Sequence, residues 1–312
     1  MAPRIVTLTL NPAIDLAGTA PWVRPVHKIR TTGEHVDPGG GGINVARVVH
    51  ALGGDALAVL AAGGATGRFL TELLDEAGVA YRAVPIAGRT RVSFTVRAED
   101  SGAEYRFVPA GPELAEAEWR AALASVDAAE GGFVVASGSL PPGVPAEAYA
   151  IAARAAAAHG RRFVLDTSGP ALRASLGAGI DLLKPSLGEL ESLVGHKVTD
   201  AAAQAAEARA LVEGGAARMV AVSLGADGAL LATAEGVVRR PALAGPVRSA
   251  VGAGDAFLAA MVLALARGAA PAEALDWGLA AGAAAVSGVG TARLHRADVA
   301  ARYQTLTGKD LL

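Results

Sequence analysis

The sequence contains no cysteine, and this one absence removes three kinds of chemistry. Disulfide bonds, thiolate metal sites and cysteine nucleophiles are all excluded. A chain of 312 residues that is 52% hydrophobic can nevertheless stabilise a core without cross-links. This length suits one large α/β domain with an appendage, or two modest domains. Because an exported protein of this length without disulfides is less usual than a cytosolic one, we expect a cytoplasmic location.

A basic block and a long apolar run are also missing. The formal net charge is -2 and the isoelectric point is about 6.3, so the sequence offers no concentrated positive face for nucleic acid or an anionic membrane. The apolar run from Ile5 to Leu10 is too short for the hydrophobic region of a signal peptide. No segment reaches the roughly 18 apolar residues of a transmembrane helix. We therefore expect neither a nucleic-acid partner nor a membrane partner.

Lysine is scarce, with four residues against 24 arginines. A lysine in this chain is therefore more informative than usual. Lys28 and Lys184 both fall beside the motifs described below.

Apolar strands alternate with helical patterns along most of the chain, which predicts an α/β fold whose mostly parallel sheet is covered on both faces. Ligands in such folds bind beyond the carboxyl ends of the strands. One region differs: residues 91–98 and 104–108 alternate with a period of two around a polar tip, which predicts a hairpin. With part of residues 12–36, this hairpin predicts a small antiparallel appendage. The expected strands are 5–10, 56–61, 133–136, 162–166, 181–184, 219–223 and 229–234, and the expected helices are 43–52, 69–77, 113–128, 145–159, 186–195, 199–214, 254–268 and 271–287.

Four consecutive glycines, Gly39 to Gly42, precede the first of these helices. Such a run loses much conformational entropy on folding, so it needs a reason. We infer that a ligand approaches this backbone closely, since the free N–H groups at a helix start attract anions and hydroxyls. A flexible loop is the alternative interpretation, but it does not explain the polar Asn44 one turn into an apolar helix.

A second helix start reads Gly252-Ala253-Gly254-Asp255. An acid there could simply complement the helix dipole, which is worth about 0.3–1 kcal/mol. The sharper interpretation is phosphoryl transfer. The amides of this turn would neutralise charge on the transferring group, and Asp255 would accept the proton of the attacking hydroxyl.

Several familiar motifs are absent. The sequence has no Gly-x-x-x-x-Gly-Lys-Ser/Thr loop, no His-Arg-Asp loop with Asp-Phe-Gly, and no Gly-x-Ser-x-Gly elbow. These absences exclude P-loop enzymes, protein kinases and the usual serine hydrolases. A Rossmann dehydrogenase is excluded as well, because Asn11-Pro12 stands where Gly-x-Gly-x-x-Gly would follow the first strand.

In order and spacing, the motifs resemble the ribokinase-like carbohydrate kinases, the PfkB family, nearly from end to end. The matching segments are 8–15 (LTLNPAID), 38–47 (PGGGGINVAR), 62–67 (AGGATG), 137–143 (SGSLPPG), 184–185 (KP) with 189–190 (EL), 222–225 (VSLG) and 251–255 (VGAGD). The resemblance implies one ribokinase-like kinase domain over residues 1–312, a three-layer, doubly wound α/β fold with a mostly parallel sheet. It also implies a small antiparallel β lid, formed by about 12–36 and 90–109, which shields the sugar site and forms the contact of a homodimer.

The GGGGINVAR form is most similar to family members that phosphorylate fructose 6-phosphate at the 1-hydroxyl with ATP. The resemblance makes Asp255 the base and Gly252, Ala253 and Gly254 the anion hole. It implies these substrate-binding residues: Asp15, Gly40, Gly41, Gly42 and Asn44 on the sugar, Ser139 beside it, and Lys28, Arg91 and Arg106 on its phosphate.

For the nucleotide, similarity points to Lys184, Ser186, Ser223, Leu224, Gly225 and Gly228, with an adenine wall near Val247, Leu279 and Ala283. Glu189 resembles the acid that organises Mg²⁺ through water, which suits the few carboxylates that Mg²⁺ requires. A monovalent cation such as K⁺ is also implied, on the carbonyls of Ser249, Val251, Ala285, Gly288 and Gly290.

Two departures from the family pattern affect these expectations. Ser186 stands where the family usually has asparagine, and the shorter side chain reaches less far toward phosphate and Mg²⁺. Gly41 stands where fructose-1-phosphate and tagatose-6-phosphate kinases tend to have lysine, which favours fructose 6-phosphate. Kinases for those two sugars are the alternative, and a catalytically silent regulator that binds sugar phosphate or nucleotide is an alternative of another class.

Overall fold

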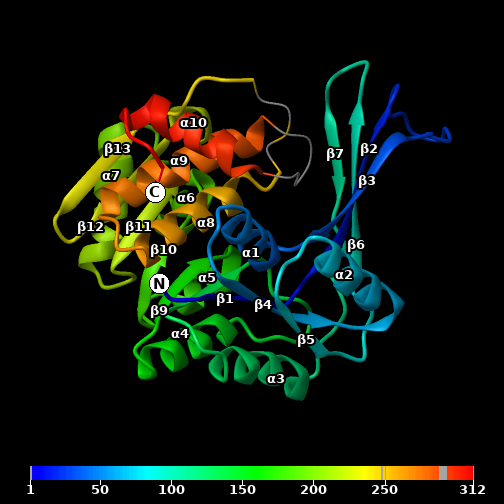
Figure 1. The fold of residues 1–312 in the computed structure, drawn as a ribbon, viewed down its shortest axis with the longest axis horizontal. Helices are drawn as coiled ribbons and strands as arrows, with labels where there is room; N and C mark the ends of the chain where they lie inside the picture. Colours follow the sequence, from blue (N-terminus) through cyan, green and yellow to red (C-terminus); the bar gives the residue numbers. More distant parts are fainter. Residues whose placement is uncertain (1, 247–248, 250, 288–293, 312) are drawn as a thin grey trace.

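The computed structural model describes residues 2–246, 249, 251–287 and 294–311. Its main sheet has nine strands in the order β13-β12-β11-β10-β9-β8-β1-β4-β5 (Figure 1). These strands are β1 (Ile5–Thr9), β4 (Ala56–Ala62), β5 (Tyr81–Pro85), β8 (Phe133–Ser137), β9 (Arg162–Asp166), β10 (Ile180–Leu183), β11 (Met219–Ser223), β12 (Ala229–Thr233) and β13 (Gly236–Arg240). All pairings from β5 to β11 are parallel, and β12 and β13 extend one edge as an antiparallel meander.

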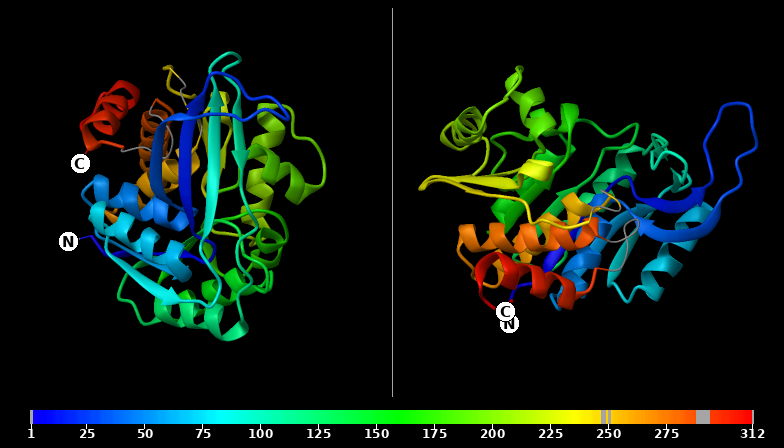
Figure 2. Two further views of the ribbon diagram at one scale, coloured as in Figure 1. Left: turned by 90° about the vertical axis from the view of Figure 1, so that its right-hand side faces the viewer. Right: turned by 90° about the horizontal axis from the view of Figure 1, so that it is seen from above.

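Helices cover both faces of this sheet, as expected (Figure 2). One face packs against α1 (Gly41–Ala51), α2 (Gly64–Glu76), α8 (Ala253–Ala266), α9 (Pro271–Val286) and α10 (Arg296–Thr307). The other packs against α3 (Glu116–Asp127), α4 (Ala148–Ala158), α5 (Gly169–Ser175), α6 (Leu187–Val194) and α7 (Ala201–Glu213). Successive residues of a strand point to opposite faces, so Ile5 joins the first cluster and Val6 the second. This arrangement confirms the three-layer, doubly wound α/β fold.

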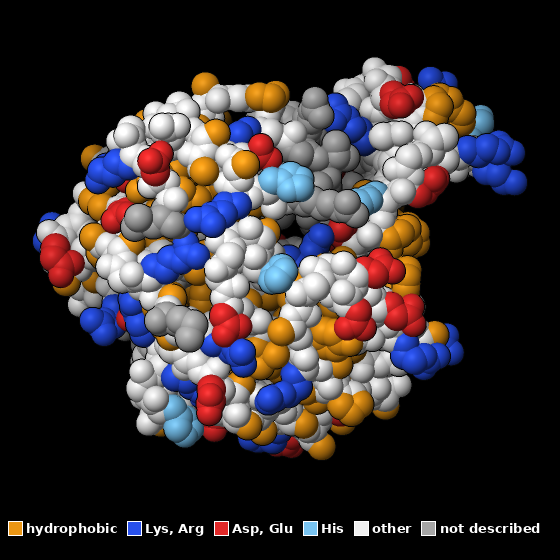
Figure 3. Space-filling model, in the orientation of Figure 1, with side chains coloured by type: hydrophobic (Ala, Val, Ile, Leu, Met, Phe, Trp, Pro, Cys, Tyr) orange, Lys and Arg blue, Asp and Glu red, His pale blue; other side chains and the backbone are white. Residues whose placement is uncertain are grey.

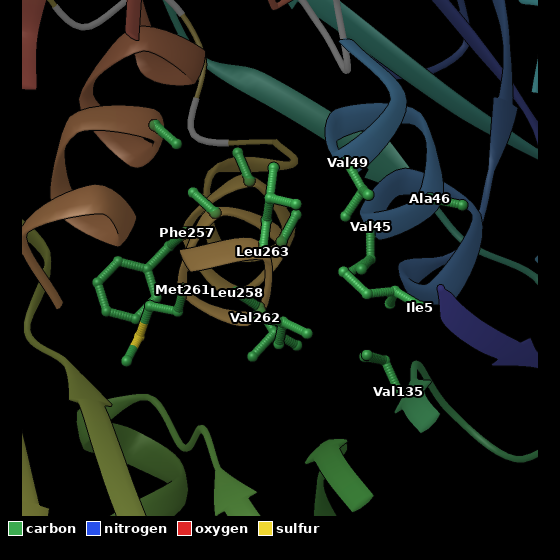
Figure 4. Packing of buried hydrophobic residues seen from close by; sticks show 14 of the residues in the cluster. Ile5, Val45, Ala46, Val49, Val135, Phe257, Leu258, Met261, Val262 and Leu263 are labelled. Atoms are coloured by element: carbon green, nitrogen blue, oxygen red, sulfur yellow. The ribbon is translucent and has the colours of Figure 1, made fainter. Parts of the chain in front are cut away.

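Helix α8 is a core helix, which explains its apolar sequence. Every residue from Ala256 to Ala266 is buried. Figure 4 shows Leu258 and Val262 of this helix packed toward the side chains of α1 and the sheet. A helix that is apolar on all sides is held rigidly by its neighbours, and this rigidity fixes the position of its first turn.

The appendage is a separate four-stranded sheet in the order β3-β2-β6-β7. Its strands are β2 (Ala13–Ala20), β3 (Thr32–Gly39), β6 (Arg91–Ala98) and β7 (Glu104–Phe107). The expected hairpin is present as β6–β7. The region expected to complete the appendage forms a second antiparallel hairpin, β2–β3, and parallel pairing between β2 and β6 joins the two. The sheet rises from one end of the core as a lid (Figures 1 and 2).

The two faces of the lid differ in chemistry. Asp15 is the register partner of Ser93, and Arg106 is the partner of Thr95 two positions further along β6, so all four share one polar face. The opposite face carries Phe94 paired with Phe107, and both are exposed.

The surface and the helices are consistent with the composition. On the face seen in Figure 3, basic and acidic side chains are intermingled. Among the described residues, none of the helices combines the length and the apolar character that a membrane span requires.

Candidate active site

The motif residues meet at the carboxyl edge of the main sheet, where a hollow of about 250 Å³ lies. The start of α1, the ends of β8 and β9, helix α6 and the first turn of α8 all contribute to it. Its lining residues are Gly41, Ser137, Gly138, Ser139, Asp166, Thr167, Ser168, Glu189 and Asp255. The position agrees with the general rule for ligand sites in doubly wound sheets.

Asp255 faces this hollow from the first turn of α8. Its Oδ2 accepts a hydrogen bond from Asn44 Nδ2 at 2.9 Å, and its Oδ1 lies 3.5 Å from the Ser137 hydroxyl. Burial raises the pKa of Asp255 to about 7, and the negative charge of Asp166 adds to this effect against the opposing influence of Asn44 and Lys184. A carboxylate with a pKa near neutrality is suited to accept a proton at physiological pH.

The amides of the same turn are directed at the same place. Gly252 caps the helix in a left-handed conformation with φ of 78°, which suits glycine. The N–H groups of Ala253, Gly254 and Asp255 belong to the first turn and have no partner within the helix. Within the described part of the chain, no carbonyl is bonded to them. They therefore form a free anion site beside the carboxylate.

The glycine run allows close packing around Asp255 and Asp15. A Cβ atom on Gly39 would lie 2.1 Å from Asp15 Oδ2, and one on Gly41 would lie 2.2 Å from the Ser137 hydroxyl. Gly40 has φ of 115°, a region that residues with a Cβ rarely adopt. The structure therefore also gives an internal reason for these glycines, because side chains of the protein occupy the space. Asn44 faces Asp255, which accounts for this polar residue in an apolar helix.

The lid contributes Asp15, Arg91 and Arg106 from its polar face. Burial raises the pKa of Asp15, while the charges of Arg91 and Arg106 oppose this. Arg91 donates to the carbonyl oxygens of Pro109 and Asn11, both at 2.8 Å. Its Nε is buried and lacks a partner among the described residues, so this guanidinium still has a donor to offer.

Lys28 is not brought to this site within one chain. It is exposed in the segment that joins β2 and β3 at the tip of the lid (Figure 1). Thr19 and Thr32 form the last paired position of that hairpin, and Lys28 lies beyond them. Four residues of strand separate Asp15 from Thr19, which places the tip more than about 13 Å further along the lid.

On the nucleotide side, Lys184 follows β10 and is almost fully buried. Its Nζ lies 3.1 Å from Asp166 Oδ2. A Cβ on Gly254 would lie 3.5 Å from the same Nζ, so the ammonium is next to the free amides of α8. Burial alone would lower the pKa of Lys184, but the carboxylates of Asp166, Asp255 and Glu189 raise it, so the side chain remains a cation.

Ser186 and Glu189 form a capping box at the start of α6. Glu189 Oε2 accepts from the Ser186 amide at 2.8 Å and from its hydroxyl at 2.9 Å. Ser186 therefore orients Glu189, a structural role that the sequence analysis did not foresee.

The remaining nucleotide and cation residues lie in two loops. Ser223 bonds the Pro185 carbonyl at 3.1 Å, which places the turn Ser223, Leu224, Gly225 and Gly228 beside the start of α6. Leu224 is buried, whereas Gly225 and Gly228 adopt positive φ.

The residues expected to bind a monovalent cation lie near one another in part. The Ser249 amide donates to Val286 O at 3.3 Å, which brings Ser249 and Val251 close to Ala285. Gly288, Gly290 and Val247 lie outside the described residues. Of the other two adenine-wall residues, Leu279 is buried in the core and Ala283 is partly exposed.

Sequence reasoning assigned no role to several polar residues at or beside the site, among them Ser137, Asp166 and Asn11. Asp166 ends β9 directly after an apolar run, and this position at the carboxyl edge could have identified it. Asn11 is buried at the end of β1, where its Nδ2 donates to Ala110 O at 2.9 Å and lies 3.3 Å from the Ser139 hydroxyl. Asn11 belongs to the motif over residues 8–15, but periodicity alone gives no reason to assign it a role.

The model of the pfkB family carbohydrate kinases matches residues 7–297. The chain is 46% identical over 299 residues to an ATP-dependent 6-phosphofructokinase isozyme 2 of Mycobacterium tuberculosis, covering 95% of this chain and 88% of the relative. The isozyme 2 of Escherichia coli is 41% identical, with 97% and 99% covered. A 1-phosphofructokinase of Escherichia coli is 36% identical, with 85% of each chain covered.

Solved structures show the same likeness over nearly the whole chain. Phosphofructokinase-2 from Escherichia coli in complex with fructose-6-phosphate gives a TM-score of 0.92 at 40% identity, covering 98% of this chain and 99% of that one. The same enzyme in complex with potassium gives a TM-score of 0.93 at 41% identity, with 98% and 99% covered. Its tetrameric inhibited form gives 0.92 at 40% identity, with the same coverage.

Proposed function

The chain belongs to the pfkB family of carbohydrate kinases, and on this basis we propose that it transfers the terminal phosphoryl group of ATP to the 1-hydroxyl of fructose 6-phosphate. The products are fructose 1,6-bisphosphate and ADP. The observation that carries the proposal is the position of Asp255, whose carboxylate and neighbouring amides face one hollow. Residues 1–312 act as one catalytic unit, with the four-stranded sheet as its lid.

In the proposed reaction, Asp255 takes the proton of the sugar 1-hydroxyl as its oxygen attacks the terminal phosphorus of ATP. The bond from that phosphorus to the oxygen of ADP breaks, and this oxygen carries away the electron pair. The free amides of Ala253, Gly254 and Asp255 stabilise the charge on the three oxygens in transit. Lys184 adds a buried positive charge beside them.

The carboxylates at the rim of the hollow fit Mg²⁺. Glu189 and Asp166 both line it, and an oxygen-rich site with few carboxylates is what Mg²⁺ prefers when it keeps most of its water. These two residues would hold the ion, which neutralises phosphate charge when bound. Ser186 serves this site by orienting Glu189. The turn from Ser223 to Gly228, which contains Leu224 and Gly225, binds the nucleotide beside it.

The polar face of the lid and the start of α1 bind the sugar. Asp15, Asn44 and the backbone at Gly40, Gly41 and Gly42 take the hydroxyls, and Ser139 is held in place by Asn11. Arg91 and Arg106 bind the 6-phosphate, consistent with their charge acting on Asp15. Nη1 and Nη2 of Arg91 already donate to backbone carbonyls, so we propose that Nε is the donor that contacts the ligand.

We further propose a homodimer formed through the lids. The face of the lid opposite its polar face exposes Phe94, Tyr105 and Phe107 together, and an exposed apolar patch of this kind marks a contact surface. In such a dimer, Lys28 would serve the site of the partner copy, since it lies too far along the lid to serve its own.

A monovalent cation completes the proposal. One structure of Escherichia coli phosphofructokinase-2 is a complex with potassium. In the present chain, the carbonyls of Ser249, Val251 and Ala285 offer oxygen ligands for such an ion. Turnover should rise when K⁺ replaces tetramethylammonium at constant ionic strength. Equal turnover in both salts would reject a role for the cation.

Fructose 1-phosphate is the alternative substrate, since the chain is also similar to a 1-phosphofructokinase. The geometry around Gly41 argues against it. A side chain at this position would meet Ser137 Oγ at 2.2 Å, so the lysine of the fructose-1-phosphate kinases does not fit without moving Ser137.

The deciding experiment compares kcat/KM for fructose 6-phosphate, tagatose 6-phosphate, fructose 1-phosphate and fructose, measured as ADP release. We expect fructose 6-phosphate to give the highest value and fructose the lowest. A higher value for fructose 1-phosphate would replace the proposed substrate with the alternative. Binding of these sugars without ADP release from any of them would support a silent regulator instead.

A further inference from the structure

Arg47 lies in the glycine-rich motif, yet the proposed reaction gives it no role. Its side chain is only 14% exposed. Nη2 donates to Asp37 Oδ1 at 2.8 Å, and Nη1 donates to the carbonyl oxygen of Pro38 at 3.3 Å. Both acceptors belong to the end of β3, just before the four glycines, whereas Arg47 comes after them on α1. The arginine therefore closes a clasp around residues 38–46.

The residues inside and beside this clasp are those that hold the sugar in the proposed function. Asn44, one turn before Arg47 on the same helix, bonds Asp255 at 2.9 Å. Asp15 is the register partner of Asp37 across the β2–β3 hairpin. The glycines have no side chains with which to fix their own backbone. An ion pair that spans the run is a direct way to hold its two ends in register.

Arg47 also offsets a repulsion on the polar face of the lid. Asp37 raises the pKa of Asp15, because two carboxylates at paired positions repel each other. Arg47 supplies the opposite charge to Asp37, and His35 Nε2 lies 2.9 Å from its other oxygen. The pair thereby limits the charge that Asp37 exerts on Asp15.

Arg47 does not line the hollow that contains Asp255. With Asp37 and Pro38 it lines a second cavity of about 460 Å³, whose wall is formed by β3, α1, the end of α2, the start of α8 and the end of α9. It therefore acts on the substrate only through other groups, which distinguishes it from Arg91 and Arg106.

We propose that Arg47 is a positioning residue for the sugar phosphate, holding the lid strand β3 on α1 and so fixing the glycine run between Asp37 and Asn44. This inference rests on the proposed function for its kinetic consequences. It predicts that Arg47 governs the affinity for the sugar and leaves the nucleotide side unaffected, since Lys184 and the Ser223–Gly228 turn lie on other elements.

The kinetic test compares Arg47→Met with Arg47→Lys, and with Arg154→Met as the matched control on the exposed face of α4. For Arg47→Met we expect KM for fructose 6-phosphate to rise about tenfold, equivalent to about 1.4 kcal/mol of binding free energy. KM for ATP should stay within about twofold and kcat within about threefold. For Arg47→Lys, KM for fructose 6-phosphate should lie between the values for the wild type and Arg47→Met, because lysine keeps the charge of arginine but lacks its planar guanidinium. Arg154→Met should match the wild type.

A second measurement does not depend on the kinase reaction. Amide hydrogen exchange in residues 39–46 of the sugar-free protein should be at least about tenfold faster in Arg47→Met than in the wild type, since breaking the clasp permits local opening. Arg154→Met should leave the exchange rate unchanged.

Unchanged exchange in Arg47→Met would overturn the clasp even if the substrate assignment holds. Faster exchange with equal rises in KM for sugar and ATP would overturn the selective role. Should Arg47→Met not fold, unchanged exchange in Arg47→Lys would likewise refute the inference. A protein without kinase activity but with faster exchange would refute the proposed function and keep the clasp.

Discussion

Replacing Asp255 with asparagine should abolish turnover and at the same time stabilise the fold. The folded protein holds the pKa of this carboxyl at about 7 instead of 3.8. Above pH 7 the ionised form is therefore less stable in the folded state by up to about 4 kcal/mol, since each pKa unit corresponds to about 1.4 kcal/mol. Hydration of the open hollow and the altered bond to Asn44 reduce this gain. We expect Asp255→Asn to be more stable than the wild type by about 1–2 kcal/mol at pH 8.

The pH dependence of this gain follows from proton counting. Between about pH 4 and pH 7 the folded wild type keeps a proton that the unfolded chain has lost, so its stability falls as the pH rises through this window. Asparagine has no such dependence. The difference between variant and wild type should therefore be small at pH 4, grow toward pH 7 and stay constant above it.

Thermal melts at pH 5 and pH 8 measure this difference, together with kcat from ADP release. At pH 8 we expect Tm to rise by about 1.5–3 °C and kcat to fall by about 10²–10⁴. Asp298→Asn is the matched control, because Asp298 is an exposed acid in the first turn of α10. Its loss should lower stability slightly and leave kcat unchanged. A lower Tm for Asp255→Asn at pH 8, or near-normal turnover, would refute the assignment of Asp255 as a destabilised base.

Three further predictions follow from the site and the lid. In the wild type, kcat/KM should rise tenfold per pH unit below about pH 7 and level off above it, because only ionised Asp255 accepts the proton; a flat profile would contradict this role. Lys184→Met leaves the Asp166 carboxylate without its counter-charge and should cost about 3 kcal/mol in urea unfolding; an unchanged midpoint would show that the pair adds no stability. Phe107→Glu should give a monomer in analytical ultracentrifugation, whereas Phe69→Glu, a change at another exposed phenylalanine on α2, should not; a dimer in both variants would place the contact elsewhere.

The sequence predicted the core of the fold and the chemistry of the site because both depend on local patterns. Apolar runs such as Ile5–Thr9 are buried on both faces, so they are easily recognised as central parallel strands. The placement of Asp255 also followed from local features, namely small residues leading into an apolar helix. The two-residue alternation predicted the appendage, and the family resemblance identified it as a lid and supplied the substrate.

The elements and residue roles that the sequence did not predict share a different cause, because each depends on tertiary context. The edge strand β5 has mostly exposed or half-exposed residues and no clear alternation, and α5, β13 and α10 were not predicted either. Helix α2 begins at Gly64, five positions before the expected start, because a glycine-rich turn gives no helical pattern. The capping role of Ser186 and the distance of Lys28 from its own site could not be read from spacing alone.

The parallel pairing of β2 with β6 has a consequence for how the protein folds. These adjacent strands are separated in the chain by β3, which pairs with the other edge of β2, and by α1, β4, α2 and β5. Closing so long a loop costs entropy that only a preformed core can offset. We therefore expect the sugar site to form after the core, so that a partly folded chain would bind nucleotide before it could bind a sugar.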